Sequence, residues 1–217
     1  MTAIAQKYRS HFTDSNFISS LLVAFAFLFI SLVINFYAGT YATERASNAV
    51  TDIILSNIRV YDVEWMFVYG SISFWIFVAS LLLHEPKRIP FVLKSIAVFV
   101  CVRSIFISLT HIGPFPTELV INSNAISYFT FGADLFFSAH TGLPFLMALI
   151  FWDHQYLRIF FVASAILFGI VVLLAHLHYS IDVLAAFFIT YSIYHIAEIL
   201  FPKDKRMFAS GAATSAR

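Results

Sequence analysis

Long apolar runs separated by short polar segments dominate the sequence. Six such runs lie at residues 17–38, 65–83, 91–110, 135–152, 159–177 and 183–201. A helix needs about 20 apolar residues to cross the hydrocarbon core of a bilayer, and the first run is longer than the roughly 7–15 residues of a signal-peptide core. The pattern therefore predicts an all-α, polytopic bundle of six transmembrane helices over residues 17–201. A cytoplasmic leader at 1–16 precedes it and a basic tail at 202–217 follows it.

The composition agrees with a membrane protein and argues against other classes. Hydrophobic residues make up 60% of the 217 residues and charged residues only 12%, whereas soluble domains carry about 25% charged residues. The net charge is +1 and no basic patch is visible, which argues against a nucleic-acid partner. The chain has a single cysteine, Cys101, so an intramolecular disulfide is excluded.

The uneven distribution of lysine and arginine predicts the orientation of the helices. If the N-terminus is cytoplasmic, nine of the 13 basic residues are cytoplasmic: Lys7, Arg9, Lys87, Arg88, Arg158, Lys203, Lys205, Arg206 and Arg217. Arg45 and Arg59 fall on the outer side, while Lys94 and Arg103 fall inside the third run. Both termini are therefore predicted to be cytoplasmic. We expect Lys94 to reach the inner headgroups and the tail at 202–217 to be a disordered basic end against anionic lipid.

Two imidazoles and a carboxylate stand at the start of the last apolar run, in the stretch His-Leu-His-Tyr-Ser-Ile-Asp at 176–182. If Ser180 begins a helix, His178 and Asp182 are four residues apart and share a face, so the carboxylate can orient the imidazole. The alternative is a pair of interfacial histidines with Asp182 as a helix-start carboxylate. His176 is assigned a structural role, and His195 has no evident partner.

Two further ionisable side chains are predicted at the same depth. At about 1.5 Å per helical residue, Arg103 lies about 10 Å below the outer surface, counted from Thr110, and His140 about 9 Å below it, counted from Asp134. Asp182 opens the last span nearby. Ionisable groups inside a membrane are costly and are usually paired or functional, so the three together predict a site. The alternatives are that Arg103 snorkels to the surface and that His140 is a hydrogen-bonding residue between helices.

These residue types suit a phosphate ligand. Arginine offers planar donors, and the fourth and sixth spans both begin on the outer side, so their positive ends point at an anion there. One histidine can attack phosphorus while the other protonates the departing oxygen, and Asp182 would set the tautomer of His178. The spacing offers no carboxylate-rich oxygen cage for Mg²⁺, so we expect neither a metal nor another cofactor.

Three stretches resemble signature motifs of the sphingomyelin synthase-like branch of the lipid phosphate phosphatase (type 2 phosphatidic acid phosphatase) superfamily. Residues 132–141 (GADLFFSAHT) and 173–183 (LLAHLHYSIDV) resemble its third and fourth motifs, and the stretch RSIFISLT from Arg103, followed by GPFP at 113–116, resembles its second. The resemblance implies a six-helix membrane core. It also implies roles for three residues: His178 as nucleophile, Asp182 as its relay partner, and His140 acting on the leaving alcohol.

Residues and resemblance together predict an integral membrane enzyme with its active site on the outer face. It would move a phospho-headgroup from a phospholipid donor to a lipid alcohol such as ceramide or diacylglycerol, through a phosphohistidine on His178. Ser138 is expected to hydrogen-bond the phosphate, and Asp134 to cap the fourth helix or meet a cationic headgroup. The oligomeric state is left open.

Three alternatives remain. A lipid phosphate phosphatase or phospholipase C-type hydrolase would use the same residues with water as the acceptor. A haem could be held between His140 and His178, as in membrane cytochromes. A non-catalytic lipid-binding scaffold is supported by Ala139, which stands where the family usually has glycine.

Overall fold

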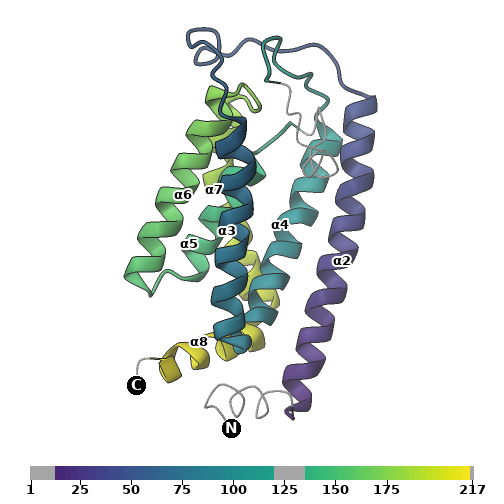
Figure 1. Cartoon of the computed structure of the whole chain (residues 1–217). Helices are drawn as coiled ribbons and strands as arrows, with labels where there is room; N and C mark the ends of the chain where they lie inside the picture. Colours follow the sequence, from purple (N-terminus) through teal and green to yellow (C-terminus); the bar gives the residue numbers. More distant parts are fainter. Residues whose placement is uncertain (1–12, 120–134, 216–217) are drawn as a thin grey trace.

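The protein is a bundle of helices, described by a computed structural model over residues 13–119 and 135–215. Four long helices, α2 (Ser15–Glu44), α3 (Glu64–His84), α6 (Gln155–Leu174) and α7 (Ser180–Leu200), run along the bundle with α4 (Ile89–Leu109), which the short turn η1 (Pro86–Arg88) precedes. The remaining helices are α5 (Ala139–Ile150), inside the bundle, and α8 (Pro202–Ser215), across one end (Figure 1). No strand occurs within the described residues.

The outward faces of the long helices are apolar. Large hydrophobic side chains such as Phe29, Ile76, Ile166 and Phe188 are exposed on α2, α3, α6 and α7. Five of the helical segments are long and apolar enough to cross a membrane: α2, α3, α4 with η1, α6 and α7. An apolar surface of this extent is stable only against lipid, so the chain is an integral membrane protein.

Small residues let α2 pack closely along α4. The buried positions Phe17, Ala24, Ser31 and Ala38 recur every seven residues on α2, and Ala42 continues the same face. A seven-residue repeat keeps one narrow stripe against a neighbouring helix, and small side chains allow two backbones to approach. The arrangement places Arg103 of α4 on the inner side of the bundle, where its side chain is buried.

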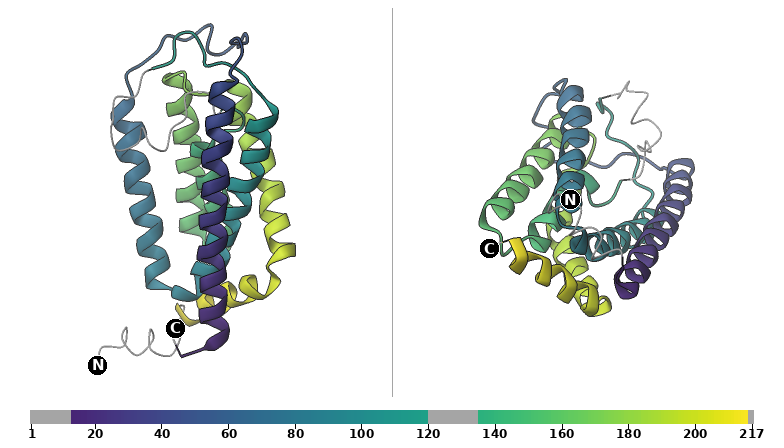
Figure 2. Two further views of the ribbon diagram at one scale, coloured as in Figure 1. Left: turned by 90° about the vertical axis from the view of Figure 1, so that its right-hand side faces the viewer. Right: turned by 60° about the horizontal axis from the view of Figure 1, so that its bottom comes forward.

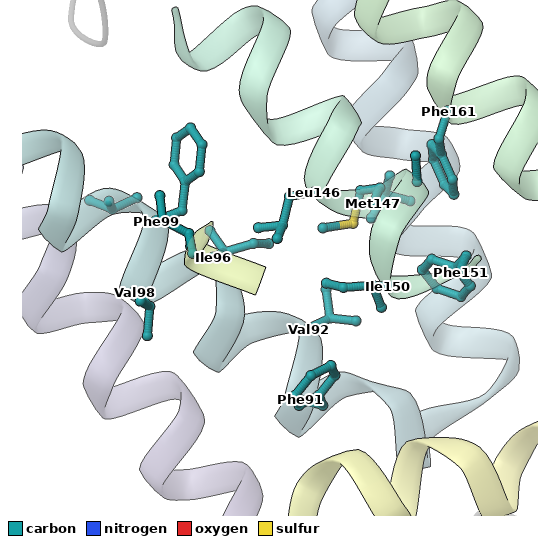
Figure 3. Packing of buried hydrophobic residues seen from close by; sticks show 14 of the residues in the cluster. Phe91, Val92, Ile96, Val98, Phe99, Leu146, Met147, Ile150, Phe151 and Phe161 are labelled. Atoms are coloured by element: carbon teal, nitrogen blue, oxygen red, sulfur yellow. The ribbon is translucent and has the colours of Figure 1, made fainter. Parts of the chain in front are cut away.

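The fourth apolar run differs from its expected form. It predicts a full span over 135–152, but α5 has only 12 residues, about 18 Å of helix against a hydrocarbon core of about 30 Å. Leu146 and Met147 of α5 are fully buried and pack in one cluster with Ile96 and Phe99 of α4 (Figure 3). The run is apolar because it lies inside the bundle, and hydropathy alone does not distinguish that from contact with lipid.

One end of the bundle is closed by α8, which lies across it (Figure 2). Lys94 of α4 is buried, pairs with Asp204 of α8 at 2.7 Å, and donates to Ser20 of α2 at 2.9 Å. The expectation that Lys94 reaches the headgroups is therefore wrong, because a carboxylate from the tail neutralises it internally. The expected disorder of the tail is likewise wrong for residues 202–215, which form the helix that supplies this carboxylate.

The opposite end is covered by two connections, residues 45–63 and 110–119, which lie over the turn between α6 and α7. Ser47 donates to the carbonyl of His111 at 2.8 Å, and Leu119 donates to that of Ala175 at 3.0 Å. Gly113 lies so close to the carbonyl of Ser47 that an added Cβ would overlap its oxygen, so glycine is required there. These contacts fix the connections over the part of the bundle that holds the candidate site.

Candidate active site

The pair His178 and Asp182 forms the centre of the site. Nδ1 of His178 lies 3.2 Å from Oδ2 of Asp182, and both side chains are buried. The same carboxylate oxygen accepts a hydrogen bond from the amide of Tyr179 at 3.1 Å. One carboxylate thus holds the imidazole and the residue that follows it.

The sequence brings this pair together by a different route from the one expected. The helix α7 begins at Ser180, so His178 lies before the helix and not on its face. Asp182 is the third residue of α7, where an acidic side chain commonly reaches back to the amide at the helix start. Its capping position is what points it at His178. The two readings of Asp182, imidazole partner and helix-start carboxylate, therefore both describe its contacts.

Strained backbone precedes both histidines of the site. Within the described residues, positive φ at a residue other than glycine occurs at His176 (56°) and Phe137 (22°). Such conformations cost about 1–3 kcal/mol each and persist where the surroundings hold them. His176 is buried and its Nδ1 lies 2.7 Å from the hydroxyl of Thr117, which agrees with a structural role for this residue.

A main-chain hydrogen bond joins the two histidine-bearing segments. The amide of Ser138 donates to the carbonyl of Asp182 at 3.1 Å. Among the residues that the structure describes, the buried Ser138 hydroxyl has no hydrogen-bond partner, and it does not cap α5 although the residue occupies the capping position. An unpaired buried hydroxyl costs free energy unless a ligand or water satisfies it. Ser138 therefore places a hydroxyl donor beside the His178–Asp182 pair.

Arg103 comes to the same place from α4. Its guanidinium Nε donates to the carbonyl of Phe137 at 3.4 Å, one residue before Ser138. The side chain is buried, which excludes the alternative that it snorkels to the surface. The contact places a permanent positive charge beside the start of α5.

His140 is the second residue of α5 and faces a small cavity. It lies within electrostatic range of both His178 and Arg103, and its ring is 4.3 Å from that of Phe67 of α3. The cavity has a volume of about 120 Å³ and is lined by Ser71, Phe74, Trp75, Ala139, His140, Leu143, Pro144 and Phe168. Pro144 has no amide hydrogen to donate to the carbonyl of His140 four residues earlier, so the helix is less tightly bonded at this histidine.

Three other expectations from the sequence concern Asp134, His140 and His195. Asp134 lies outside the described residues. The depth count for His140 assumed a helix from Asp134, but residues 135–138 are not helical, so that distance estimate is wrong although His140 still approaches His178. His195 has a partner that was not anticipated, Glu198, with Nδ1 to Oε2 at 2.8 Å. Its own position three residues before Glu198 was the available signal.

The start of α7 differs from the expectation that two helix starts are open to an anion. Its first amide, that of Ser180, donates to Oδ2 of Asp52 at 2.7 Å, and the preceding amide, that of Tyr179, donates to Asp182. The end of α7 is thus occupied by two carboxylates. Within residues 13–119 and 135–215 no side chain caps α5, so the start of α5, beside Arg103 and Ser138, is a helix end suited to a phosphate group. Among the described residues, no group of three or more His, Cys, Asp or Glu side chains is arranged to hold a metal ion.

Comparison with known proteins shows that the site-bearing segment is similar to a known family. Residues 132–199 match the model of a family described as PAP2 superfamily C-terminal. This segment contains Ser138, His140, His178 and Asp182, while Arg103 lies outside it. The segment is therefore similar to the lipid phosphate phosphatase superfamily, whose members are generally phosphatases or phosphotransferases. No curated protein and no solved structure matched the chain.

Proposed function

We propose that the protein is a membrane phosphotransferase that moves a phospho-headgroup from a phospholipid to a lipid alcohol such as ceramide or diacylglycerol. The observation that carries the proposal is the contact between Nδ1 of His178 and Asp182. With Nδ1 protonated and donating to the carboxylate, Nε2 keeps its lone pair, and this nitrogen is the nucleophile.

The first half-reaction forms a phosphohistidine. Nε2 of His178 attacks phosphorus, the bond from phosphorus to the alcohol oxygen of the donor breaks, and the imidazolium of His140 gives its proton to that oxygen. Diacylglycerol leaves. Arg103 and the hydroxyl of Ser138 donate to the non-bridging phosphate oxygens as their charge increases in the transition state.

The second half-reaction reverses the roles. Neutral His140 removes the proton of the acceptor hydroxyl, the acceptor oxygen attacks phosphorus, and the bond to Nε2 breaks. His178 is then neutral and His140 is protonated for the next cycle. One histidine can serve both halves because the departing and the attacking oxygen occupy the same side of phosphorus.

The cavity beside His140 supports a lipid alcohol in this position. Its walls are mostly apolar, from Phe74, Trp75, Leu143 and Phe168, and it lies between α3, α5 and α6. Its volume of about 120 Å³ is well above the roughly 10–15 Å³ that a cavity needs to hold one water molecule, so it admits a short apolar segment next to the imidazole. The proposal therefore places the alcohol, donor or acceptor, on the α3 side of His140.

A hydrolase acting on a lipid phosphate is the second candidate, because the matched family supports phosphatase chemistry as well as transfer. It would use the same residues with water in the second half-reaction. For either reaction, the distribution of lysine and arginine supports cytoplasmic termini and a site on the non-cytoplasmic side.

The test is headgroup transfer by the purified full-length protein in lipid vesicles. Phosphatidylcholine, phosphatidylethanolamine, phosphatidylglycerol and phosphatidic acid, each with a labelled phosphate, are supplied in turn with and without ceramide. Transfer gives a labelled product lipid only when the acceptor is present, whereas hydrolysis gives a labelled water-soluble phosphate in both cases. His178→Ala should abolish both products, and His195→Ala, a histidine paired with Glu198 away from the site, is the matched control. Turnover by His178→Ala equal to that of the unmodified protein would reject the proposal.

A further inference from the structure

The carboxylate of Asp52 binds the connection between α2 and α3, residues 45–63, to the start of α7. Its Oδ2 accepts from the amide of Ser180 at 2.7 Å and from the hydroxyl of the same residue at 2.8 Å. Its Oδ1 accepts from the amides of Ile54 at 2.8 Å and Leu55 at 3.1 Å. Asp52 is 6% exposed. The carboxylate therefore has four donors and fixes two segments that are distant in the sequence.

The residue that Asp52 binds, Ser180, lies between His178 and Asp182 in the sequence. Ser180 is two residues after His178 and two residues before Asp182, at the first position of α7. Asp182 holds the amide of Tyr179 and Asp52 holds the next amide, so consecutive amides of this turn are anchored from inside and outside the helix. The orientation of the turn depends on both anchors.

The surroundings of Asp52 make its position rigid. Leu55, three residues later, is buried in a cluster with Tyr179 and Leu135. The hydroxyl of Tyr179 donates to the carbonyl of Gly113 at 2.8 Å and accepts from the amide of Val50 at 3.2 Å. Asp52 is thus held at the helix start by packing on one side and by main-chain hydrogen bonds on the other.

We infer that Asp52 is a positioning residue for His178: it holds the start of α7 so that the imidazole keeps its contact with Asp182 and its aim at phosphorus. The inference rests on the proposed function. The contact between Nδ1 and Oδ2 is 3.2 Å, at the long limit of a strong hydrogen bond, so a small rotation of the turn breaks it. A displacement of about 1 Å at a reacting group can lower a rate by about 100-fold.

The experiment compares the first turnover of full-length variants in vesicles, with a labelled phospholipid that the unmodified protein turns over in saturating excess over the enzyme and with no acceptor alcohol. Under these conditions the rate constant of the burst of diacylglycerol release reports the chemistry of the folded molecules, and the amplitude of the burst reports the fraction that is folded. Asp52→Ala should lower the rate constant by about 10- to 100-fold with the amplitude nearly unchanged, since the turn loses its outer anchor. KM, measured at steady state, should change by less than about threefold, since Asp52 contacts no substrate in this account.

Two further variants are expected to have smaller effects on the rate constant, and a third serves as a control. Asp52→Asn keeps an oxygen that can accept from the amide of Ser180, so it should recover most of the rate, and it is informative even where the alanine variant folds poorly. Ser180→Ala removes only the hydroxyl bond and should have a smaller effect than Asp52→Ala. Glu44→Gln removes an exposed negative charge from the same outer end of the bundle and serves as the control for charge alone.

The outcomes separate the two proposals. If Asp52→Ala reduces only the amplitude and leaves the rate constant within twofold of the unmodified protein, Asp52 is a structural residue and the inference is overturned, while an inactive His178→Ala still supports the proposed function. A fully active His178→Ala overturns the proposed function, and the positioning role of Asp52 is rejected with it.

Discussion

The amide of Ser138 and the carbonyl of Asp182 form a hydrogen bond of 3.1 Å that joins the starts of α5 and α7. Ser138 is followed by His140, and Asp182 contacts His178, so this bond sets the spacing between the two imidazoles. Arg103 reaches the same point through the carbonyl of Phe137. The site is thus assembled in part by main-chain groups at the starts of two helices.

Asp182→Asn is expected to lower kcat by at least about 100-fold, because an amide does not hold the protonated Nδ1 tautomer of His178 and does not stabilise its positive charge. KM should change little, since the side chain is buried beneath the histidine. Steady-state headgroup release checks this. An asparagine variant within fivefold of the unmodified protein would show that the carboxylate serves only as the cap of α7.

Arg103→Lys keeps the charge but replaces a planar group of five donors with a point charge. We expect kcat/KM to fall by about 10²- to 10³-fold, as for the loss of a donor to a developing phosphate charge. Arg45→Lys, an exposed arginine at the end of α2, is the control and should be fully active. If the two variants behaved alike, phosphate binding by Arg103 would be rejected.

The buried pair Lys94–Asp204 is expected to matter for stability and not for turnover. Removing one partner, as in Lys94→Met, leaves a buried unpaired charge and should destabilise the fold by about 3–5 kcal/mol. The double variant Lys94→Met, Asp204→Leu should regain much of that loss, because no charge is left unpaired. Thermal unfolding in detergent measures both. A single variant as stable as the unmodified protein would contradict the pairing.

His176, outside the membrane-spanning segments, is expected to make the fold sensitive to acid. Burial lowers the pKa of His176, in the turn after α6, below its usual 6.5, although Asp52 acts in the opposite direction. The folded state therefore favours the neutral imidazole, and the stability that it contributes is complete above about pH 6.5 and is lost as the pH falls below that value. His176→Asn, which retains a residue tolerant of positive φ, should show a smaller loss of melting temperature between pH 7 and pH 5.

The carboxyl of Asp52 is expected to make the fold sensitive to acid at a lower pH than His176 does. Burial by itself raises the pKa of its carboxyl, but hydrogen bonds from Ser180, Leu55 and Ile54 outweigh it and place the pKa below the usual 3.8. Its contribution to stability is present above the unfolded pKa and is lost as the pH falls through the folded pKa. The stability difference between the unmodified protein and Asp52→Asn should therefore be constant near neutral pH and shrink below about pH 4. A difference that did not depend on pH would contradict the ionised state of Asp52.

Hydropathy predicted the five long helices because a lipid-facing helix must be apolar over its whole length. It did not predict that α5 is short, since the segment 135–152 is equally apolar when buried by protein. The pairing of Lys94 with Asp204 was missed for a related reason: a lysine near a membrane surface and a lysine paired internally have the same local sequence.

The candidate site could be predicted in part. The spacing of His178 and Asp182 predicted their contact, because side chains four residues apart can meet both within a helix and at the start of one. The convergence of Arg103 and His140 followed from counting depth, although the count for His140 assumed a helix that begins later. Asp52 gave no signal, because it lies in a connection without periodicity and its partner Ser180 is far away in the sequence.

The most direct test of the account is to isolate the covalent intermediate. The full-length protein in vesicles is mixed with a phospholipid labelled in its phosphate, quenched in alkali within one turnover, and digested for mass spectrometry. The account predicts label attached to the imidazole of His178, stable in alkali, lost in acid, and absent from His178→Ala while present in His195→Ala. Rapid turnover of the lipid with no label on His178, or with label on another residue, would contradict it.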